Sequence, residues 1–284
     1  MSRIAYVNGA YVPHDMAFVH IDDRGYQFAD GVYEVVSVIG GKMIDEEPHL
    51  DRLWRSMGEL RMTEPVTRSA LKLISKQLVQ KNRLKNALLY IQVSRGVAKR
   101  DHAFPQGDLR SSLVMTCRRF DFGAVRERAK TGIKVSSQPD IRWGRCDIKA
   151  TALLPNVLAK QAAKEAGAFE AILVDADGNV TEGSSTSVWM VDKNGTLVTR
   201  PLKDNILPGI TRATLIELAE KHQIRIEERA FSIEEAKASE EMFLTSATSC
   251  AMPIVELDGS AISNGKPGSV ATKLVELYWD FAGK

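Results

Sequence analysis

Residues 23–41 read DRGYQFADGVYEVVSVIGG, and this stretch says most about the fold. Its first eight positions are rich in glycine, aromatic and charged residues. From Gly31 to Ile39 the composition changes to β-branched apolar residues, which favour extended backbone: Val32, Val35, Val36, Val38 and Ile39. The Gly40-Gly41 pair that follows is typical of a turn. The pattern therefore predicts a strand over 31–39 that leads into a tight turn.

Short strands and amphipathic helices alternate on both sides of this strand. Upstream, the predicted strands 4–7 and 11–12 flank Asn8-Gly9, a pair that favours a two-residue hairpin turn. Downstream, apolar residues at helical spacing predict a helix over 48–61. The remaining expected elements are helices over 67–81, 153–166 and 269–281, helices that start at Thr211 and Ser232, and strands over 87–94, 112–118, 133–136, 171–174, 187–191, 196–199 and 241–244.

Local signals mark some helix ends and one long loop. Gly167 stands where a left-handed residue closes a helix, and Ser232 with Glu235 has the spacing of a capping box. A polar loop over 96–107 separates two strands, and loops of this length in compact domains are usually functional or disordered. We expect an α+β protein with a small N-terminal α/β domain over 1–120, a charged interdomain linker over 121–132 and a large C-terminal domain over 133–284.

The composition is that of an ordinary globular chain. The 284 residues are 44% hydrophobic and 26% charged, with a formal net charge of +2, which excludes a disordered chain, a collagen and a coiled coil. So small a net charge gives no field to attract nucleic acid or an anionic membrane. No apolar run approaches the ~20 residues that span a bilayer, and the N-terminus turns polar at Asn8-Gly9 before a signal-peptide core could form.

The cysteines and histidines give no metal motif. The three cysteines, at positions 117, 146 and 250, are widely spaced and include no Cys-x-x-Cys pair. They predict reduced thiols in a cytoplasmic protein. The five histidines are scattered, and the sequence lacks the common nucleotide-binding, zinc-protease and serine-hydrolase signatures. We therefore expect no metal site.

Four stretches in a fixed order are more specific. They are 23–35, 145–149 (RCDIK), 180–187 (VTEGSSTS) and 207–212 (LPGITR). Together they resemble the fold-type IV aminotransferases that depend on pyridoxal 5'-phosphate (PLP), and within that family most closely its D-amino acid (D-alanine) aminotransferases. The resemblance covers nearly the whole chain. It implies a two-domain fold with an active site between the domains, and a homodimer.

The resemblance assigns two residues to the reacting part of the cofactor. Lys149 matches the Schiff-base lysine of the family, whose amine must lose a proton before it can attack an aldehyde. Glu182 matches the acid that faces the pyridine nitrogen and keeps the ring protonated. Outside this motif context, Lys149 would be read as a solvated surface lysine, and Glu182 equally well as a turn carboxylate before a strand.

The cofactor phosphate needs positive charge and backbone donors. Arg52 matches the phosphate-binding arginine of the family, although alone it would be read as a solvated residue on a helix face. The backbone N–H groups of Ile210 and Thr211, after a glycine at a helix start, form a ready anion site. A second donor pair matches Ser246 and Ala247. Because the D-alanine enzymes often have threonine at the latter position, we expect somewhat weaker retention of the cofactor.

The loop residues 94–102 read SRGVAKRDH and resemble the Arg-x-His loop of the D-alanine enzymes. There the arginine and histidine bind the α-carboxylate of a substrate held by the neighbouring subunit, so the resemblance gives this role to Arg100 and His102. Tyr33 matches a third carboxylate contact. Val35 and Tyr90 are candidates for the side-chain pocket, but either fits equally well as a core strand residue.

The resulting expectation is a homodimeric PLP enzyme that exchanges amino groups between D-amino acids and 2-oxo acids, such as D-alanine and 2-oxoglutarate. Two alternatives share the fold: a branched-chain L-aminotransferase and an aminodeoxychorismate lyase. The branched-chain enzymes lack the Arg-x-His loop. A third alternative, from another functional class, is a PLP-binding carrier or regulator without turnover, against which Lys149, Glu182 and the loop argue.

Overall fold

The computed structural model describes residues 3–107, 109–202 and 205–283, and these form two compact units. Unit 1 contains the described residues up to Asp121 together with Ile148–Ala152. Unit 2 contains Phe122–Asp147 and the described residues from Leu153 onward. Among the residues described, none of the helices has both the length and the apolar character needed to cross a membrane.

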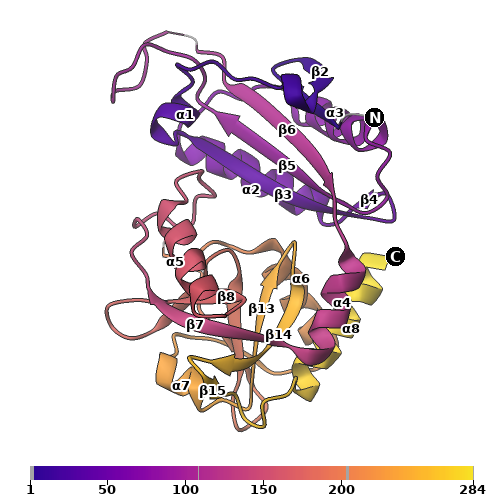
Figure 1. Ribbon diagram of the computed structural model, residues 1–284, viewed down its shortest axis with the longest axis vertical. Helices are drawn as coiled ribbons and strands as arrows, with labels where there is room; N and C mark the ends of the chain where they lie inside the picture. The colour runs from indigo at the N-terminus through magenta and orange to yellow at the C-terminus, as the bar shows by residue number, and fades with distance from the viewer. Residues whose placement is uncertain (1–2, 108, 203–204, 284) are drawn as a thin grey trace. The chain divides into compact units, whose positions relative to one another are not determined.

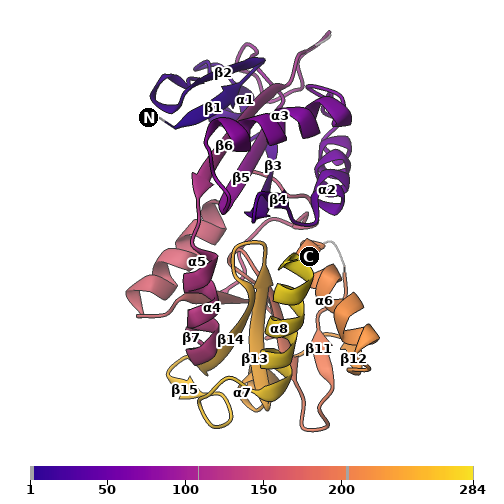
Figure 2. The same cartoon turned by 90° about the vertical axis from the view of Figure 1, so that its right-hand side faces the viewer.

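Unit 1 is a six-stranded antiparallel sheet with helices packed on it. The strand order is β2-β1-β6-β5-β3-β4, and all its pairs are antiparallel. The strands are β1 (Ile4–Val7), β2 (Ala10–Pro13), β3 (Gly31–Ile39), β4 (Lys42–Met43), β5 (Ala87–Ser94) and β6 (Ser112–Arg119). The helical elements are η1 (His14–Met16), α1 (Arg24–Phe28), α2 (Glu46–Glu59) and α3 (Arg68–Lys81). Figures 1 and 2 show the two long helices, α2 and α3, lying along this sheet.

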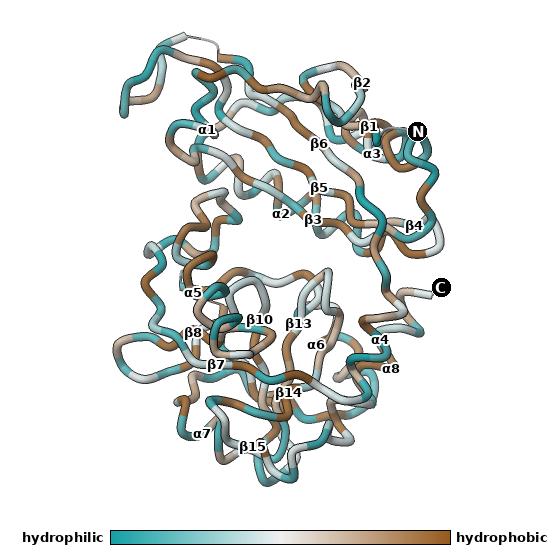
Figure 3. Tube along the Cα trace, viewed as in Figure 1, coloured by the Kyte–Doolittle hydropathy of each residue, from teal (hydrophilic) through white to brown (hydrophobic). Residues whose placement is uncertain are grey.

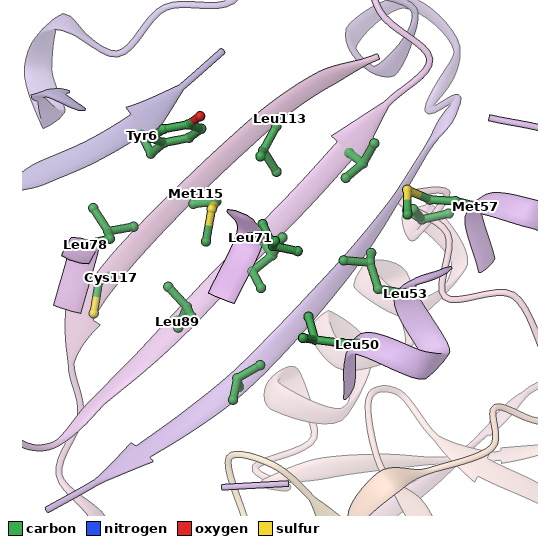
Figure 4. Close-up of a cluster of buried hydrophobic side chains, with 14 of the residues drawn as sticks. Tyr6, Leu50, Leu53, Met57, Leu71, Leu78, Leu89, Leu113, Met115 and Cys117 are labelled. Atoms are coloured by element: carbon green, nitrogen blue, oxygen red, sulfur yellow. The ribbon is translucent and has the colours of Figure 1, made fainter. Parts of the chain in front are cut away.

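The core of unit 1 lies between α2, α3 and one face of this sheet (Figure 4). Leu50, Leu53 and Met57 of α2 are each at most 2% exposed. They pack with Leu71 and Leu78 of α3 and with buried residues of the sheet, among which are Leu89, Leu113, Met115 and Cys117. Burial of each large aliphatic side chain contributes about 1.5–3 kcal/mol. Figure 3 shows hydrophobic stretches recurring along the strands and helices of this unit.

Unit 2 contains a nine-stranded mixed sheet. The order is β12-β11-β10-β13-β14-β7-β8-β9, with β15 paired to β14. Three strand pairs are parallel: β11 with β12, β14 with β7 and β7 with β8. The strands are β7 (Ile133–Pro139), β8 (Glu170–Val174), β9 (Val180–Gly183), β10 (Ser187–Val191), β11 (Leu197–Thr199), β12 (Ile226–Glu228), β13 (Glu241–Ser246), β14 (Cys250–Leu257) and β15 (Ser260–Ala261).

The helices of unit 2 form two groups around this sheet. Helix α5 (Leu154–Glu165) packs on β7 and β8, whereas α6 (Ile210–Lys221) and α8 (Ser269–Gly283) contact β13 and each other. Helix α4 (Phe122–Thr131) packs on β14 and α8, and α7 (Ile233–Lys237) is short. The Trp189 and Phe243 rings stack inside the sheet layer, with centroids 5.5 Å apart.

Several local predictions are confirmed in detail. Asn8 and Gly9 have φ values of 47° and 107°, as the hairpin turn between β1 and β2 requires. Gly167 has φ 74° and follows Ala166, the C-cap residue of α5. The Ser232 side chain accepts a hydrogen bond from the backbone N–H of Glu235 (3.0 Å), which is half of the expected capping box.

Other boundaries differ from the sequence-based expectation. The segment 121–132, expected to be a linker, contains α4. Its few apolar residues recur at helical spacing, and three of them, Phe122, Val125 and Ala129, are buried. The segment that carries Lys149 belongs to unit 1, although we assigned it to the C-terminal domain. Helix α6 begins at Ile210 with Gly209 as its N-cap, so Thr211 lies inside the helix. The sequence pattern also missed η1, α1 and the strands β4, β9, β12, β14 and β15.

Candidate active site

Lys149 is fixed by backbone hydrogen bonds to β3. The N–H of Tyr33 donates to the Lys149 carbonyl (3.0 Å), and the N–H of Thr151 donates to the Gly31 carbonyl (2.9 Å). The backbone N–H of Lys149 also donates to Oγ of Ser56 on α2 (3.3 Å). These bonds explain why Ile148–Ala152 joins unit 1, and they hold the lysine backbone against two elements of that unit.

The Lys149 side chain lies over an aromatic ring. Its Nζ is 4.4 Å from the centroid of the Tyr33 ring, a distance suited to a cation–π contact. Lys149 is half-buried. It is therefore not a freely solvated surface lysine, and the structure brings two of the predicted site residues together.

Tyr33, Val35 and Tyr90 form one half-buried group. In β3, alternate residues Val32, Val36 and Val38 enter the core, so Tyr33 and Val35 project from the other face of the sheet. Val35 lies opposite Tyr90 in the register of β3 and β5, and the Tyr33 and Tyr90 rings are 5.8 Å apart. Burial, with Tyr33 close by, raises the pKa of Tyr90 to about 12. These residues are therefore not part of the core cluster.

Arg52 is engaged by a buried carboxylate of β3. Glu34 is fully buried and accepts from both Nε (2.7 Å) and Nη2 (2.9 Å) of Arg52, while Nδ1 of His49 lies 2.7 Å from its Oε2. Burial alone would raise the pKa of Glu34, but the charge and hydrogen bonds of Arg52, with the His49 contact, hold that pKa at about 2. Arg52 is only 7% exposed, which excludes a solvated helix-face arginine. Sequence reasoning missed Glu34 and His49.

Arg100 and His102 meet on the ring of Phe28. The Arg100 guanidinium lies 5.1 Å from the centroid of this ring, and the His102 ring lies 5.4 Å from it. Both loop residues are exposed. Within the described residues, no hydrogen bond, ion pair or ring contact joins this pair to Tyr33 or Lys149.

In unit 2, Glu182 lies in β9 and is only 6% exposed. Its carboxylate pairs with Nη1 of Arg142. Nε and Nη2 of the same arginine donate to Oδ1 (2.9 Å) and Oδ2 (2.8 Å) of Asp140. Burial would lower the pKa of Arg142, but the Asp140 hydrogen bonds and the Glu182 charge raise it above its usual value. Glu182 thus faces a permanent cation. The sequence did contain a signal for Asp140 and Arg142, because both are charged residues that closely follow the end of β7.

The expected backbone donors lie near one end of the neighbouring strands β10 and β13. Helix α6 has no side-chain cap at Gly209, and the first N–H groups of a helix have no acceptor within it. A Cβ at Gly209 would come 2.7 Å from Oγ of Ser187, so a larger residue would require the serine side chain to shift. Ser187 pairs with Thr245 in the sheet, which places Ser246 and Ala247 at the same end of these strands.

The comparisons with known proteins agree with this geometry. Residues 31–257 match the family model of amino-transferase class IV. The chain is 38% identical over 269 residues to the D-alanine aminotransferase of Bacillus licheniformis, covering 95% of this chain and 93% of that protein. It is 35% identical over 273 residues to the D-alanine aminotransferase of Staphylococcus aureus, covering 96% and 95%. The chain therefore belongs to the amino-transferase class IV family.

A structural comparison supports the same fold. The branched-chain amino acid aminotransferase of Escherichia coli matches with a TM-score of 0.90 at 22% sequence identity, covering 99% of this chain and 94% of that one. At this identity the match shows the fold. The confirmed fold class is that of the two-domain, α+β, fold-type IV aminotransferases, and the chain is a transaminase that uses PLP.

The residues present fit this cofactor. PLP offers a phosphate, a ring nitrogen and an aldehyde, which call for anion donors, an acid and an amine. The start of α6 has no side-chain cap and supplies backbone donors. Ser187 lies close to this helix start, because Gly209 has no side chain. Glu182 supplies a buried carboxylate, and Lys149 supplies a half-buried amine. Each unit therefore carries groups of the chemical type that one or more parts of the cofactor would need.

Proposed function

We propose that the enzyme exchanges amino groups between D-amino acids and 2-oxo acids, converting D-alanine and 2-oxoglutarate to pyruvate and D-glutamate. The observation that carries this proposal is the pair Arg100 and His102, held side by side on Phe28 in a chain whose relatives are D-alanine aminotransferases. An arginine and a histidine two residues apart provide a charge-assisted clamp for a carboxylate.

Lys149 is the proposed catalytic base and acid. When bound, PLP supplies an electron sink that stabilises negative charge at the substrate Cα. As the Schiff-base lysine, Lys149 would hold the aldehyde of the cofactor, and its Nζ would serve as the base that takes the proton from the substrate Cα and as the acid that delivers it to the former aldehyde carbon. The backbone bonds to β3 and Ser56 support this role, because they limit how far the lysine can move.

Glu182 is proposed to hold the proton of the cofactor's ring nitrogen. A carboxylate performs this task only if it stays ionised, and the pairing with Arg142 favours its charged form. Arg142 is in turn held by Asp140, so the acid is oriented as well as charged.

Four further groups are proposed to bind the phosphate: the backbone N–H groups of Ile210 and Thr211, and the donors of Ser246 and Ala247, with Arg52 as the cationic partner. Oγ of Ser246 already lies in a polar turn, 2.7 Å from Oγ of Ser249 and 3.2 Å from Oγ1 of Thr248. Ala247 offers its backbone only, so retention of the cofactor should rest more on the helix start than in relatives with threonine.

The substrate α-carboxylate is proposed to bind Arg100, His102 and Tyr33. One lysine adds the proton from one side of the cofactor, so the position of the carboxylate decides which enantiomer points its Cα–H at Lys149. Val35 and Tyr90 stand on the same sheet face as Tyr33 and are candidates to line the side-chain pocket.

A homodimer is part of this proposal. The absence of contact between Arg100 or His102 and Tyr33 within the described chain agrees with a loop that serves a neighbouring subunit. Large apolar side chains are also exposed on unit 1, namely Met16, Phe18, Ile21 and Tyr26, at 61 to 76%. Large exposed apolar side chains in one short segment are consistent with a protein interface.

We propose a cytoplasmic location on separate grounds. Cys117, Cys146 and Cys250 are free and buried, and unpaired cysteines are usual where thiols are kept reduced.

A panel of D- and L-amino acids, each with 2-oxoglutarate as acceptor, tests the proposed function. We expect D-alanine to be the faster donor and D-glutamate to appear in equal amount to pyruvate. Faster turnover of L-leucine or L-valine would favour a branched-chain L-aminotransferase. Pyruvate released from aminodeoxychorismate without an amino acceptor would favour the lyase.

A further inference from the structure

Arg24 is a buried arginine that neither the cofactor nor the substrate assignment uses. It lies in α1, within the polar segment that precedes β3, and is only 3% exposed. Its guanidinium has five donor hydrogens, which must find acceptors when buried. The identity of those acceptors indicates what this residue does.

The acceptors are the backbone carbonyls of the Arg-x-His loop. Nη1 of Arg24 donates to the carbonyl of Asp101 (2.6 Å) and to that of Ala103 (3.3 Å), and Nη2 donates to the carbonyl of His102 (3.4 Å). Three consecutive residues of the loop are thus bound from one side chain. The middle one is His102 itself, and the first follows Arg100 directly.

A shared carboxylate fixes the position of Arg24. Its Nε donates to Oδ2 of Asp30 (2.8 Å), and the same carboxylate accepts from Nε (2.7 Å) and Nη2 (3.0 Å) of Arg95. Arg95 also lies under the Phe104 ring, 3.7 Å from its centroid. Burial would raise the pKa of Asp30, but the hydrogen bonds from both arginines lower it, so the carboxylate stays charged. The ion pair with Asp30 therefore anchors Arg24, and through Arg95 the same carboxylate also binds the start of the loop.

Phe28, one helical turn after Arg24, provides the surface on which the loop side chains rest. The Arg24 guanidinium is 4.8 Å from the centroid of the Phe28 ring. Arg100 and His102 contact the same ring, as described above. Helix α1 thus holds the loop backbone through one residue and the loop side chains through another.

The loop stem is closed by the same helix. The N–H of Arg24 donates to the Gly96 carbonyl (2.9 Å), and Gly96 has φ 102° at a point where a Cβ would collide with the Arg110 carbonyl. The stem therefore enters and leaves beside α1.

From these contacts we propose that Arg24 is a positioning residue for substrate recognition, which holds Arg100 and His102 in the geometry that binds the α-carboxylate. This inference rests on the proposed carboxylate-binding role of those two residues. Because Arg24 reaches the loop only through carbonyl oxygens, its removal loosens the loop backbone and leaves the chemistry of the loop side chains intact. A misplacement of about 1 Å at a binding group can cost on the order of a hundredfold.

The test compares Arg24→Met with Arg68→Met in the holoenzyme. Methionine keeps an unbranched apolar stem but donates no hydrogen bond. Arg68 is the matched control: an arginine of the same unit that pairs with Glu47 and Asp51, outside the loop and the proposed binding residues. We expect Arg24→Met to raise KM for D-alanine and Ki for propionate, a carboxylate without an amine, about ten- to a hundredfold. We expect kcat to change less than about threefold, and Arg68→Met to leave all three values near wild type.

Two further variants separate the possible failures. Arg24→Lys keeps a charge for Asp30, but its single ammonium cannot reach three carbonyls, so its KM and Ki should fall between wild type and Arg24→Met. Arg100→Ala tests the site itself. If Arg100→Ala weakens propionate inhibition and Arg24→Met does not, the positioning role is overturned while the proposed function stands. If Arg100→Ala has no effect, the proposed carboxylate site is wrong. If Arg24→Met does not fold, Phe28→Leu tests whether α1 positions the loop. Raised KM and Ki support this positioning, and unchanged values overturn it.

Discussion

Replacing Glu34 with glutamine should show how strongly unit 1 depends on one buried ion pair. The fall in the pKa of Glu34 from 4.5 to about 2 corresponds to roughly 3 kcal/mol of folding free energy, at about 1.4 kcal/mol per pKa unit. Removing one partner of a buried pair costs a similar amount, about 3–5 kcal/mol. Glu34→Gln should therefore destabilise unit 1 by about 3 kcal/mol at pH 7.

The pH dependence gives this prediction its sign. The pKa of Glu34 is lower in the folded chain than its usual value, so the pair stabilises the fold fully above about pH 4.5 and progressively less as the pH falls toward 2. The difference in stability between wild type and Glu34→Gln should shrink over that interval and be nearly absent at its acid end. The groups that face Glu34 are Arg52 and His49, both on α2.

Denaturant unfolding between pH 7 and pH 2 measures the difference in free energy of unfolding between wild type and Glu34→Gln. Hydrogen exchange at the amides of β3 and β5 reports the stability of unit 1 separately. The control is Glu127→Gln, because Glu127 pairs with Lys130 at the surface, where the side chains are 70% and 68% exposed. An exposed pair of this kind contributes at most about 1 kcal/mol. A Glu34→Gln effect no larger than that of the control, or equal at pH 7 and pH 2, would refute the reasoning.

Three more predictions concern the proposed catalytic and binding residues. Lys149→Ala removes the group that moves the substrate proton, so turnover in a coupled pyruvate assay should fall by several powers of ten; a wild-type rate would refute its role. Glu182→Gln should keep near-normal cofactor content by absorbance but react slowly, and recovery of cofactor-free protein would give Glu182 a structural role instead. Arg100→Ala should lose about 1.5–3 kcal/mol of contact with the carboxylate, or roughly ten- to a hundredfold in kcat/KM for D-alanine, and an unchanged D-over-L ratio would count against it.

Local patterns predicted most of the elements, since the forces that form them are local. Strand β3 was expected at its observed bounds because β-branched residues fill it. The helix expected from Thr67 is α3, and Thr67 is its N-cap, whose side chain accepts a hydrogen bond from the N–H of Ala70. Helix α4 was missed because the segment has few apolar residues, and only burial against β14 and α8 reveals its periodicity.

The candidate site shows a similar division. Lys149 and Glu182 were proposed from short motifs, but the residues that contact them come from distant positions in the chain. Ser56 is 93 residues from Lys149, and Arg142 is 40 residues from Glu182. The same holds for Arg24, whose hydrogen bonds to the loop span 77 to 79 residues. Spacing along one sequence cannot reveal such pairs, because they are produced by the packing of helices, strands and loops that are distant in the chain.

The central claim is that this class IV aminotransferase acts on D-amino acids. The most direct measurement is the half-reaction of the holoenzyme with D-alanine, L-leucine or L-valine, followed through the visible absorbance of the bound cofactor with no oxo acid present. The account predicts that D-alanine changes this absorbance fastest and releases an equal amount of pyruvate. A faster change with L-leucine or L-valine than with D-alanine would contradict it.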